Sequence, residues 1–154
     1  MCGITGIYSF SEKNQQLLSK ISAATETLKK RGPDGSGIFS ENKVALGHCR
    51  LSIIDTSAIA NQPMYDDEER HVIIYNGEIF NFRELKTTYL SNENFRTHSD
   101  TEVFLKLYKK FKEETFSLLR GFFAAAIYDR ATERLTLVRD RFGKKPLLYY
   151  KAED

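Results

Sequence analysis

Cys2 directly follows the initiator methionine, and this position gives its thiol a chemical use that an internal cysteine lacks. Once Met1 is removed, Cys2 carries a thiol and a free α-amine, which together form a nucleophile with its own general base. The reference pKa of an α-amine, roughly 7.7–8.0, leaves a useful fraction neutral near neutral pH. A lone cysteine is more often a small buried hydrophobe, so position alone makes Cys2 a candidate nucleophile.

Asn76 and Gly77 follow the apolar run His71–Tyr75, which indicates a buried strand. An Asn-Gly pair after a strand is typical of a tight β-turn, and on the dipeptide alone this interpretation is favoured. An Asn side-chain amide next to a Gly N–H also supplies two convergent donors for an oxyanion. The two interpretations are compatible, and both stay open.

Arg50 and Asp100 are the charged candidates for holding a substrate. Taken singly, Arg50 reads as a solvated charge at a strand end and Asp100 as a helix N-cap. Together they would suit an amino acid, because a guanidinium binds an α-carboxylate and a carboxylate binds an α-ammonium group. His48 and His98 lack the spacing and the further ligands of a metal site, so no metal is predicted. Cys49, inside a strand-like run, is predicted to be an inert core thiol.

Strands and helices in an α+β order must position these residues. Apolar periodicity predicts a strand over 2–10, a helix over 11–30 and a hairpin over 37–47. An irregular loop over 55–70 precedes the strand at 71–75. Further elements follow toward the end of the chain: helices over 78–90 and 100–112, a hairpin of 122–129 with 134–140, and one more strand from 146 to 150.

Composition excludes several classes of protein. The 154 residues, 41% hydrophobic, suit one globular domain, and a net charge of +2 gives no electrostatic reason for a nucleic acid or membrane partner. Two cysteines cannot form a disulfide framework, which favours reduced thiols and a cytoplasmic location. The first residues show no signal peptide, and no apolar run approaches the ~20 residues that span a bilayer.

Eight motifs occur together and in order: MCGITGIY, RGPDGSG, GHCRLSIID, NQPM, YNGEIFNFREL, HSDTEVFL, GFFAAAIYD and RDRFGKKPLLYY. With them the chain resembles, over essentially its whole length, the class II glutamine amidotransferase domain of the asparagine synthetase family. These domains are N-terminal nucleophile hydrolases. The resemblance implies a four-layer αββα sandwich of antiparallel sheets and glutamine as the substrate.

The resemblance also implies roles for particular residues. Cys2 would attack the side-chain amide of glutamine to give a γ-glutamyl thioester, and Asn76 with the Gly77 N–H would stabilise the oxyanion. Arg50 would bind the α-carboxylate. Asp100 and Glu78 would help hold the α-ammonium end, and backbone groups near Ile53 and Ile54 would line the same pocket.

The same resemblance suggests that residues 1–154 form a type 2 amidotransferase domain that lacks its C-terminal end. No SGGxDS-type ATP-pyrophosphatase loop is present, so ATP and Mg are expected only for the missing synthetase domain, and no cofactor is expected in this chain. The ammonia acceptor and the oligomeric state stay open, with a homodimer as one alternative.

Two other functions remain open from the sequence. Retained Met1 would block the α-amine and would favour a catalytically idle module for interaction or glutamine sensing. A hydrolase of the same fold acting on another amide is a weaker alternative, because the Arg50/Asp100 pair favours a free amino acid.

Overall fold

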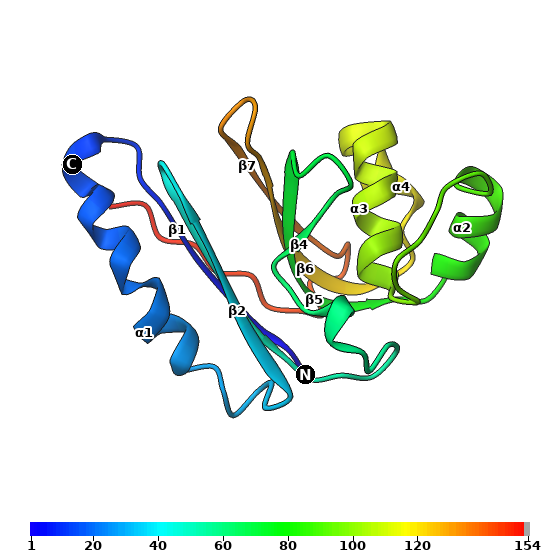
Figure 1. Ribbon diagram of the computed structural model, residues 1–154, viewed down its shortest axis with the longest axis horizontal. Helices are drawn as coiled ribbons and strands as arrows, with labels where there is room; N and C mark the ends of the chain where they lie inside the picture. Colours follow the sequence, from blue (N-terminus) through cyan, green and yellow to red (C-terminus); the bar gives the residue numbers. More distant parts are fainter. Residues whose placement is uncertain (153–154) are drawn as a thin grey trace.

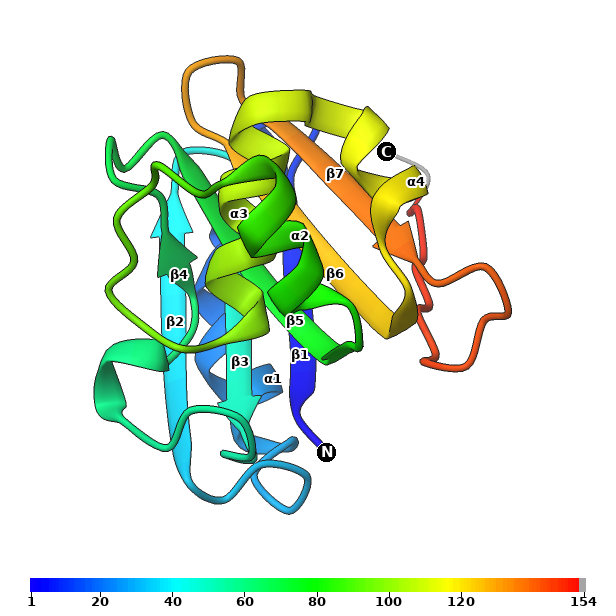
Figure 2. The same cartoon turned by 90° about the vertical axis from the view of Figure 1, so that its right-hand side faces the viewer.

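Two antiparallel sheets lie face to face, and helices cover the outer face of each (Figures 1 and 2). This computed structural model describes residues 1–152, without the side chain of Lys13. The α+β class and the four-layer αββα order predicted from the sequence are confirmed.

The first sheet has the strand order β1-β3-β2 and the second has the order β4-β5-β6-β7. Their bounds are Gly3–Tyr8 for β1, Gly35–Glu41 for β2, Val44–Arg50 for β3, Met64–Tyr65 for β4, His71–Ile79 for β5, Gly121–Asp129 for β6 and Arg134–Arg139 for β7. Both predicted hairpins are present, with β2 and β3 longer than predicted.

A 3-10 helix and α1 cover the first sheet, and the remaining α-helices cover the second. The bounds are Glu12–Lys20 for the 3-10 helix, Ile21–Glu26 for α1, Phe82–Tyr89 for α2, Asp100–Phe111 for α3 and Thr115–Leu118 for α4. Short 3-10 turns occupy Ala58–Ala60 and Lys112–Glu114. Among the residues that the structure describes, no helix has the length and hydropathy to cross a membrane.

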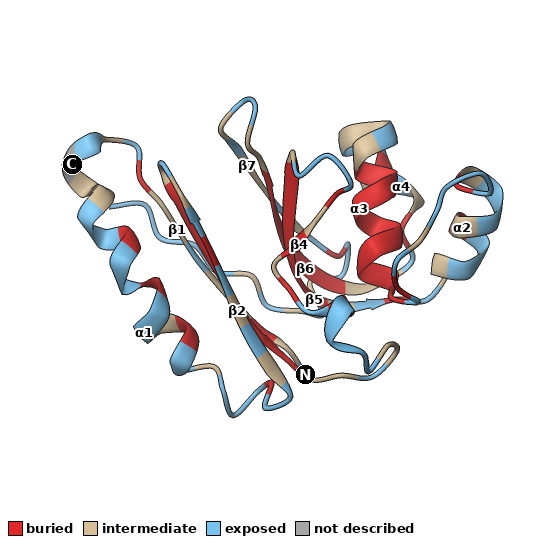
Figure 3. Ribbon diagram, in the orientation of Figure 1, coloured by how far each residue is buried: buried red, intermediate tan, exposed pale blue. Residues whose placement is uncertain are grey.

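Alternating side chains divide the apolar residues among three interlayer cores. Val44 and Leu46 of β3 pack between the two sheets, whereas Ala45 packs against Leu18 and Ile21 of the helical layer. Odd-numbered β5 residues such as Ile73 pack against α3, which is almost wholly buried (Figure 3). Because side chains alternate along a strand, Arg50 at the end of β3 and Asn76 on β5 are directed to the space between the sheets.

Several local predictions are wrong. Asn76 and Gly77 form no turn, because β6 pairs with β5 in unbroken register from His71 to Ile79. Because β5 continues through Ile79, α2 begins at Phe82 instead of at residue 78. The first helical segment is mostly 3-10 and its regular part ends at Glu26, before the turn that leads into RGPDG.

Residues 146–150 form no strand. Residues 147–151 instead line a cavity of about 630 Å³ together with side chains of β1 and β7, the facing edges of the two sheets. A segment that crosses between two edges cannot pair along either one, and Pro146 has no N–H to donate.

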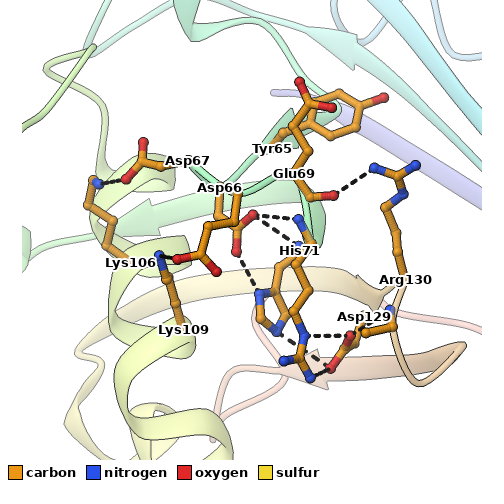
Figure 4. Close-up of polar contacts among 12 residues, drawn as sticks. Tyr65, Asp66, Asp67, Glu69, His71, Lys106, Lys109, Asp129 and Arg130 are labelled. Atoms are coloured by element: carbon orange, nitrogen blue, oxygen red, sulfur yellow. Dashed lines mark hydrogen bonds and ion pairs between the residues drawn. The ribbon is translucent and has the colours of Figure 1, made fainter.

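A polar cluster lies around the buried side chains of His71 and Asp66, at the start of β5 (Figure 4). His71 donates from Nδ1 to Asp66 Oδ2 at 2.6 Å, and Lys112 donates to His71 Nε2 at 3.0 Å. Arg70 makes two hydrogen bonds to Asp129, of 2.9 and 2.7 Å. The cluster lies at the opposite end of β5 from Asn76 and Gly77, so we assign it a structural role.

Candidate active site

Cys2 lies immediately before β1, at the end of the molecule where the two sheets approach each other (Figure 1). Its Sγ accepts a hydrogen bond from the Leu51 N–H at 3.4 Å and lies 3.7 Å from the Leu51 carbonyl oxygen. Met1, which precedes Cys2, is 56% exposed. The half-buried Cys2 thiol is thus placed beside the end of β3.

The second thiol, Cys49, is in a different environment. It is buried on the helical side of β3, and its Sγ donates to the Thr25 carbonyl at 3.2 Å. Burial raises the pKa of the Cys49 thiol, which lowers the thiolate fraction available for attack.

Asn76 and Gly77 lie within β5, where Asn76 offers a side-chain amide and Gly77 a backbone N–H. The Asn76 side chain is 5% exposed and faces the space between the sheets. Residues of an antiparallel strand direct their N–H groups alternately to the two neighbouring strands. The Tyr75 N–H bonds to Gln62 and the Ile79 N–H to Asp100, both on the side away from β6. The Gly77 N–H lies between these two and faces the same edge.

Gly77 cannot be replaced by a larger residue without moving β6. A Cβ at this position would lie 2.3 Å from the Phe122 carbonyl oxygen and 2.6 Å from the Phe123 Cα. The missing side chain therefore lets the two strands approach closely at the Gly77 N–H.

Arg50 is held by the loop that follows β3. Its guanidinium donates to the Ser57 carbonyl at 2.7 Å, to Asn61 Oδ1 at 2.8 Å and to the Asp55 carbonyl. An arginine has five N–H donors, so two remain for a ligand. The side chain is 7% exposed, and its orientation is fixed before any substrate binds.

Asp100 is the first residue of α3 but does not cap it. The cap is Ser99, whose Oγ accepts from the Glu102 N–H at 3.2 Å. Asp100 Oδ2 instead accepts from the Tyr75 hydroxyl at 2.8 Å and from the Ile79 N–H at 2.9 Å. Burial raises the pKa of Asp100, so a cationic group bound beside it would favour the ionised form.

The remaining predicted residues surround these groups. Ile53 is exposed and Ile54 half-buried in the loop between Leu51 and Asp55. Glu78 is exposed on β5, two residues after Asn76. Their roles toward a substrate stay predictions, as do those of Cys2, Arg50, Asn76, Gly77 and Asp100.

Two polar residues that sequence reasoning did not single out join the parts of the site. Asp55 Oδ2 accepts from the His98 N–H at 2.8 Å. This bond links the loop after β3, which holds the Arg50 side chain, to the residues just before α3. Hydrogen bonds from Ser57 and from the His98 N–H lower the pKa of Asp55 to about 2. Gln62 accepts from the Tyr75 N–H at 2.6 Å. Neither residue belongs to a helical or strand periodicity. The only signal for them in the sequence is that Asp55 lies in the motif GHCRLSIID and Gln62 in the motif NQPM.

His48 connects the two sheets beside Asn76. Its Nε2 lies 3.2 Å from the Tyr75 carbonyl oxygen, to which it donates as a neutral imidazole, and burial lowers the pKa of His48 to about 4. Complete burial of the ring and this low pKa make His48 a poor candidate for a general base. Over residues 1–152, no three His, Cys, Asp or Glu side chains are grouped so that they could hold a metal ion.

A family model for the glutamine amidotransferase domain matches residues 1–154, the full length of the chain. The chain belongs to this family. The amidotransferase domain is 38% identical over 147 residues to asparagine synthetase B of Escherichia coli, covering 96% of this chain and 26% of that protein. It is 39% identical over 162 residues to asparagine synthetase 1 of Bacillus subtilis, covering 100% of this chain and 25% of that protein. It thus spans about a quarter of the length of these relatives.

The fold has a counterpart among solved structures. Glutamine phosphoribosylpyrophosphate amidotransferase of B. subtilis superposes with a TM-score of 0.70 at 22% identity, over 93% of this chain and 38% of that one. The N-terminal nucleophile hydrolase fold expected for the amidotransferase domain is thereby confirmed.

Proposed function

We propose that this domain hydrolyses glutamine to glutamate and ammonia, with Cys2 as the nucleophile, and passes the ammonia to a synthetase domain. The observation that carries the proposal is that Cys2, Arg50, Gly77 and Asp100 are gathered at one end of the two sheets. Leu51 contacts Cys2, and Asp55 contacts Arg50. Asp100 bonds the strand residues that flank Gly77, and the bond from the His98 N–H to Asp55 joins the two pairs.

The reaction uses the α-amine that removal of Met1 exposes. The amine takes the thiol proton, and Sγ attacks the side-chain carbonyl carbon of glutamine. The Asn76 amide and the Gly77 N–H donate to the oxyanion of the tetrahedral intermediate. The C–N bond then breaks, the amine returns its proton to the leaving ammonia, and water cleaves the γ-glutamyl thioester to release glutamate and the thiol.

The amino acid end of glutamine is proposed to bind between two charged side chains. The two unused N–H donors of Arg50 suit the α-carboxylate, and the Asp100 carboxylate suits the α-ammonium group, with Glu78 nearby on β5. Backbone groups near Ile53 and Ile54 line the same pocket. Asp55 supports this arrangement because its carbonyl accepts from Arg50 and its carboxylate accepts from the His98 N–H, two residues before Asp100.

The acceptor for ammonia is proposed to be an ATP-dependent synthetase domain, to which ATP and Mg²⁺ belong. The support is that the relatives named above are asparagine synthetases about four times as long as this chain.

A reducing cytoplasmic location is proposed as well, because Cys2 acts only as a free thiol, and both cysteines are free in the structure.

The proposal is tested by intact mass and by ammonia release. Loss of one methionine, followed by one adduct with a glutamine-mimicking diazoketone, is expected for the processed protein. Cys2→Ala should abolish the adduct and the release of ammonia, whereas Cys49→Ala, the matched control, should stay within a few-fold of wild type. Equal losses in both variants, or retained Met1 without activity, would favour the idle module.

A further inference from the structure

The edge of β5 that faces away from β6 is closed by side chains on both sides of Gly77. β4 pairs with β5 only at Val72 and Ile73, so from Tyr75 onward no strand covers this edge. Gln62 bonds the Tyr75 N–H, and Asp100 bonds the Ile79 N–H. Only the Gly77 N–H between them is left facing the proposed site.

Gln62 occupies the place where β4 would continue along β5. Its side chain is 6% exposed, and both ends of its amide are bound. Oε1 accepts from the Tyr75 N–H at 2.6 Å, and Nε2 donates to Thr101 Oγ1 of α3 at 3.3 Å. A fixed amide thus replaces a strand residue and ties β5 to the helical layer.

Tyr75, whose N–H bonds Gln62, is also held by two further hydrogen bonds. Its carbonyl accepts from His48 Nε2 at 3.2 Å, and its hydroxyl donates to Asp100 at 2.8 Å. Burial raises the pKa of the Tyr75 hydroxyl, so it remains a donor. Because Tyr75 directly precedes Asn76 and Gly77, its position fixes where both proposed oxyanion donors point.

We propose that Gln62 is a positioning residue for the oxyanion site, which holds β5 in place so that Asn76 and Gly77 can donate to the intermediate. The inference rests on the proposed glutamine hydrolysis. Without the Gln62 acceptor, the buried Tyr75 N–H has no partner, and an unpaired buried donor drives the local backbone to rearrange. Such a shift weakens the hydrogen bonds to the transition state more than it weakens the binding of substrate by Arg50.

Three substitutions separate positioning from general stability. Gln62→Met keeps the size of the side chain and removes both hydrogen bonds, so kcat should fall roughly tenfold to a hundredfold with KM within about threefold. Gln62→Glu keeps the acceptor for Tyr75 and can accept from the Thr101 hydroxyl, so it should recover most of kcat. Gln16→Met, on an exposed face of the 3-10 helix, is the matched control and should behave as wild type.

Amide hydrogen exchange of Tyr75 gives a readout that does not require activity. The amide should be protected in the wild type and in Gln62→Glu, and should exchange at least tenfold faster in Gln62→Met. If Gln62→Met does not fold, Thr101→Val removes only the bond to Nε2 and should give a smaller loss of kcat and of protection.

The outcomes are distinct. Wild-type kcat and Tyr75 protection in Gln62→Met, or in Thr101→Val if that variant must be used, would overturn the inference, as would a rise in KM with unchanged kcat. If the processed wild type releases no ammonia, the proposed function and the catalytic role of Gln62 fail together. Tyr75 exchange then shows only whether Gln62 holds β5.

Discussion

Replacing Gly77 with alanine tests whether β5 and β6 must approach as closely as the structure shows. The added Cβ would lie 2.3 Å from the Phe122 oxygen, 2.6 Å from the Phe123 Cα and 2.7 Å from its Cβ, where an ordinary contact begins at about 3.4 Å. The strands must therefore separate by about 1 Å. Two of the three atoms belong to the backbone, so no change of rotamer relieves the contact.

The expected cost of Gly77→Ala follows from this displacement. Overpacking of this kind costs about 1–3 kcal/mol, of which the lower chain entropy of alanine in the unfolded state returns about 0.4–1 kcal/mol. A net loss of about 1–2 kcal/mol corresponds to a melting temperature lower by about 2–8 °C for a domain of this size. A displacement of about 1 Å at the Gly77 N–H should lower kcat for glutamine hydrolysis by about 10²-fold.

The assay combines calorimetric melting with ammonia release from the processed protein. Gly6→Ala is the control, because a Cβ there would meet Leu46 Cδ2 at 3.1 Å and the Ala45 oxygen at 3.4 Å, contacts that a small side-chain shift relieves. We expect this control to stay close to wild type in both measurements. Unchanged melting and kcat in Gly77→Ala, or equal losses in the two variants, would refute the close approach as the reason for glycine.

Two further predictions concern Asn76 and acid stability. Asn76→Ala should lower kcat about 10²–10³-fold with little change in KM, because it removes one oxyanion donor; steady-state kinetics that retain most of the turnover would contradict this. The hydrogen bonds from Arg70 hold the pKa of Asp129 well below the usual value of about 3.9, so its stabilisation is present above that pH and is lost as the pH falls further. Melting temperatures measured between pH 2 and 6 should therefore drop less steeply in Asp129→Asn than in wild type, and equal slopes would contradict the assignment.

The sequence by itself determined the elements whose patterns are local. The apolar run 122–128 and the segment RLTLVRD flank the turn RATE, and the hairpin β6–β7 formed as predicted. The candidate role of Cys2 was also predicted from the chain alone, because removal of Met1 would place a thiol and a free amine on one residue. The ordered motifs were specific enough to indicate the family and its four layers.

Only the tertiary structure decided the residues whose local preference competes with packing. Asn76-Gly77 favours a turn, but pairing with β6 keeps both residues in a strand. Ser99 and Asp100 are both good N-caps, and the contact of Asp100 with Tyr75 leaves the capping to Ser99.

The partners that hold the site together come from distant segments. Gln62 reaches Tyr75, Asp55 reaches His98, and His48 joins the two sheets, each across many residues of sequence. A hydrogen bond between such groups leaves no periodic trace in the sequence, because it depends on where the folded layers bring two side chains. For this physical reason the candidate nucleophile could be recognised from its position in the sequence, whereas the contacts that hold the proposed oxyanion donors became visible only in the folded chain.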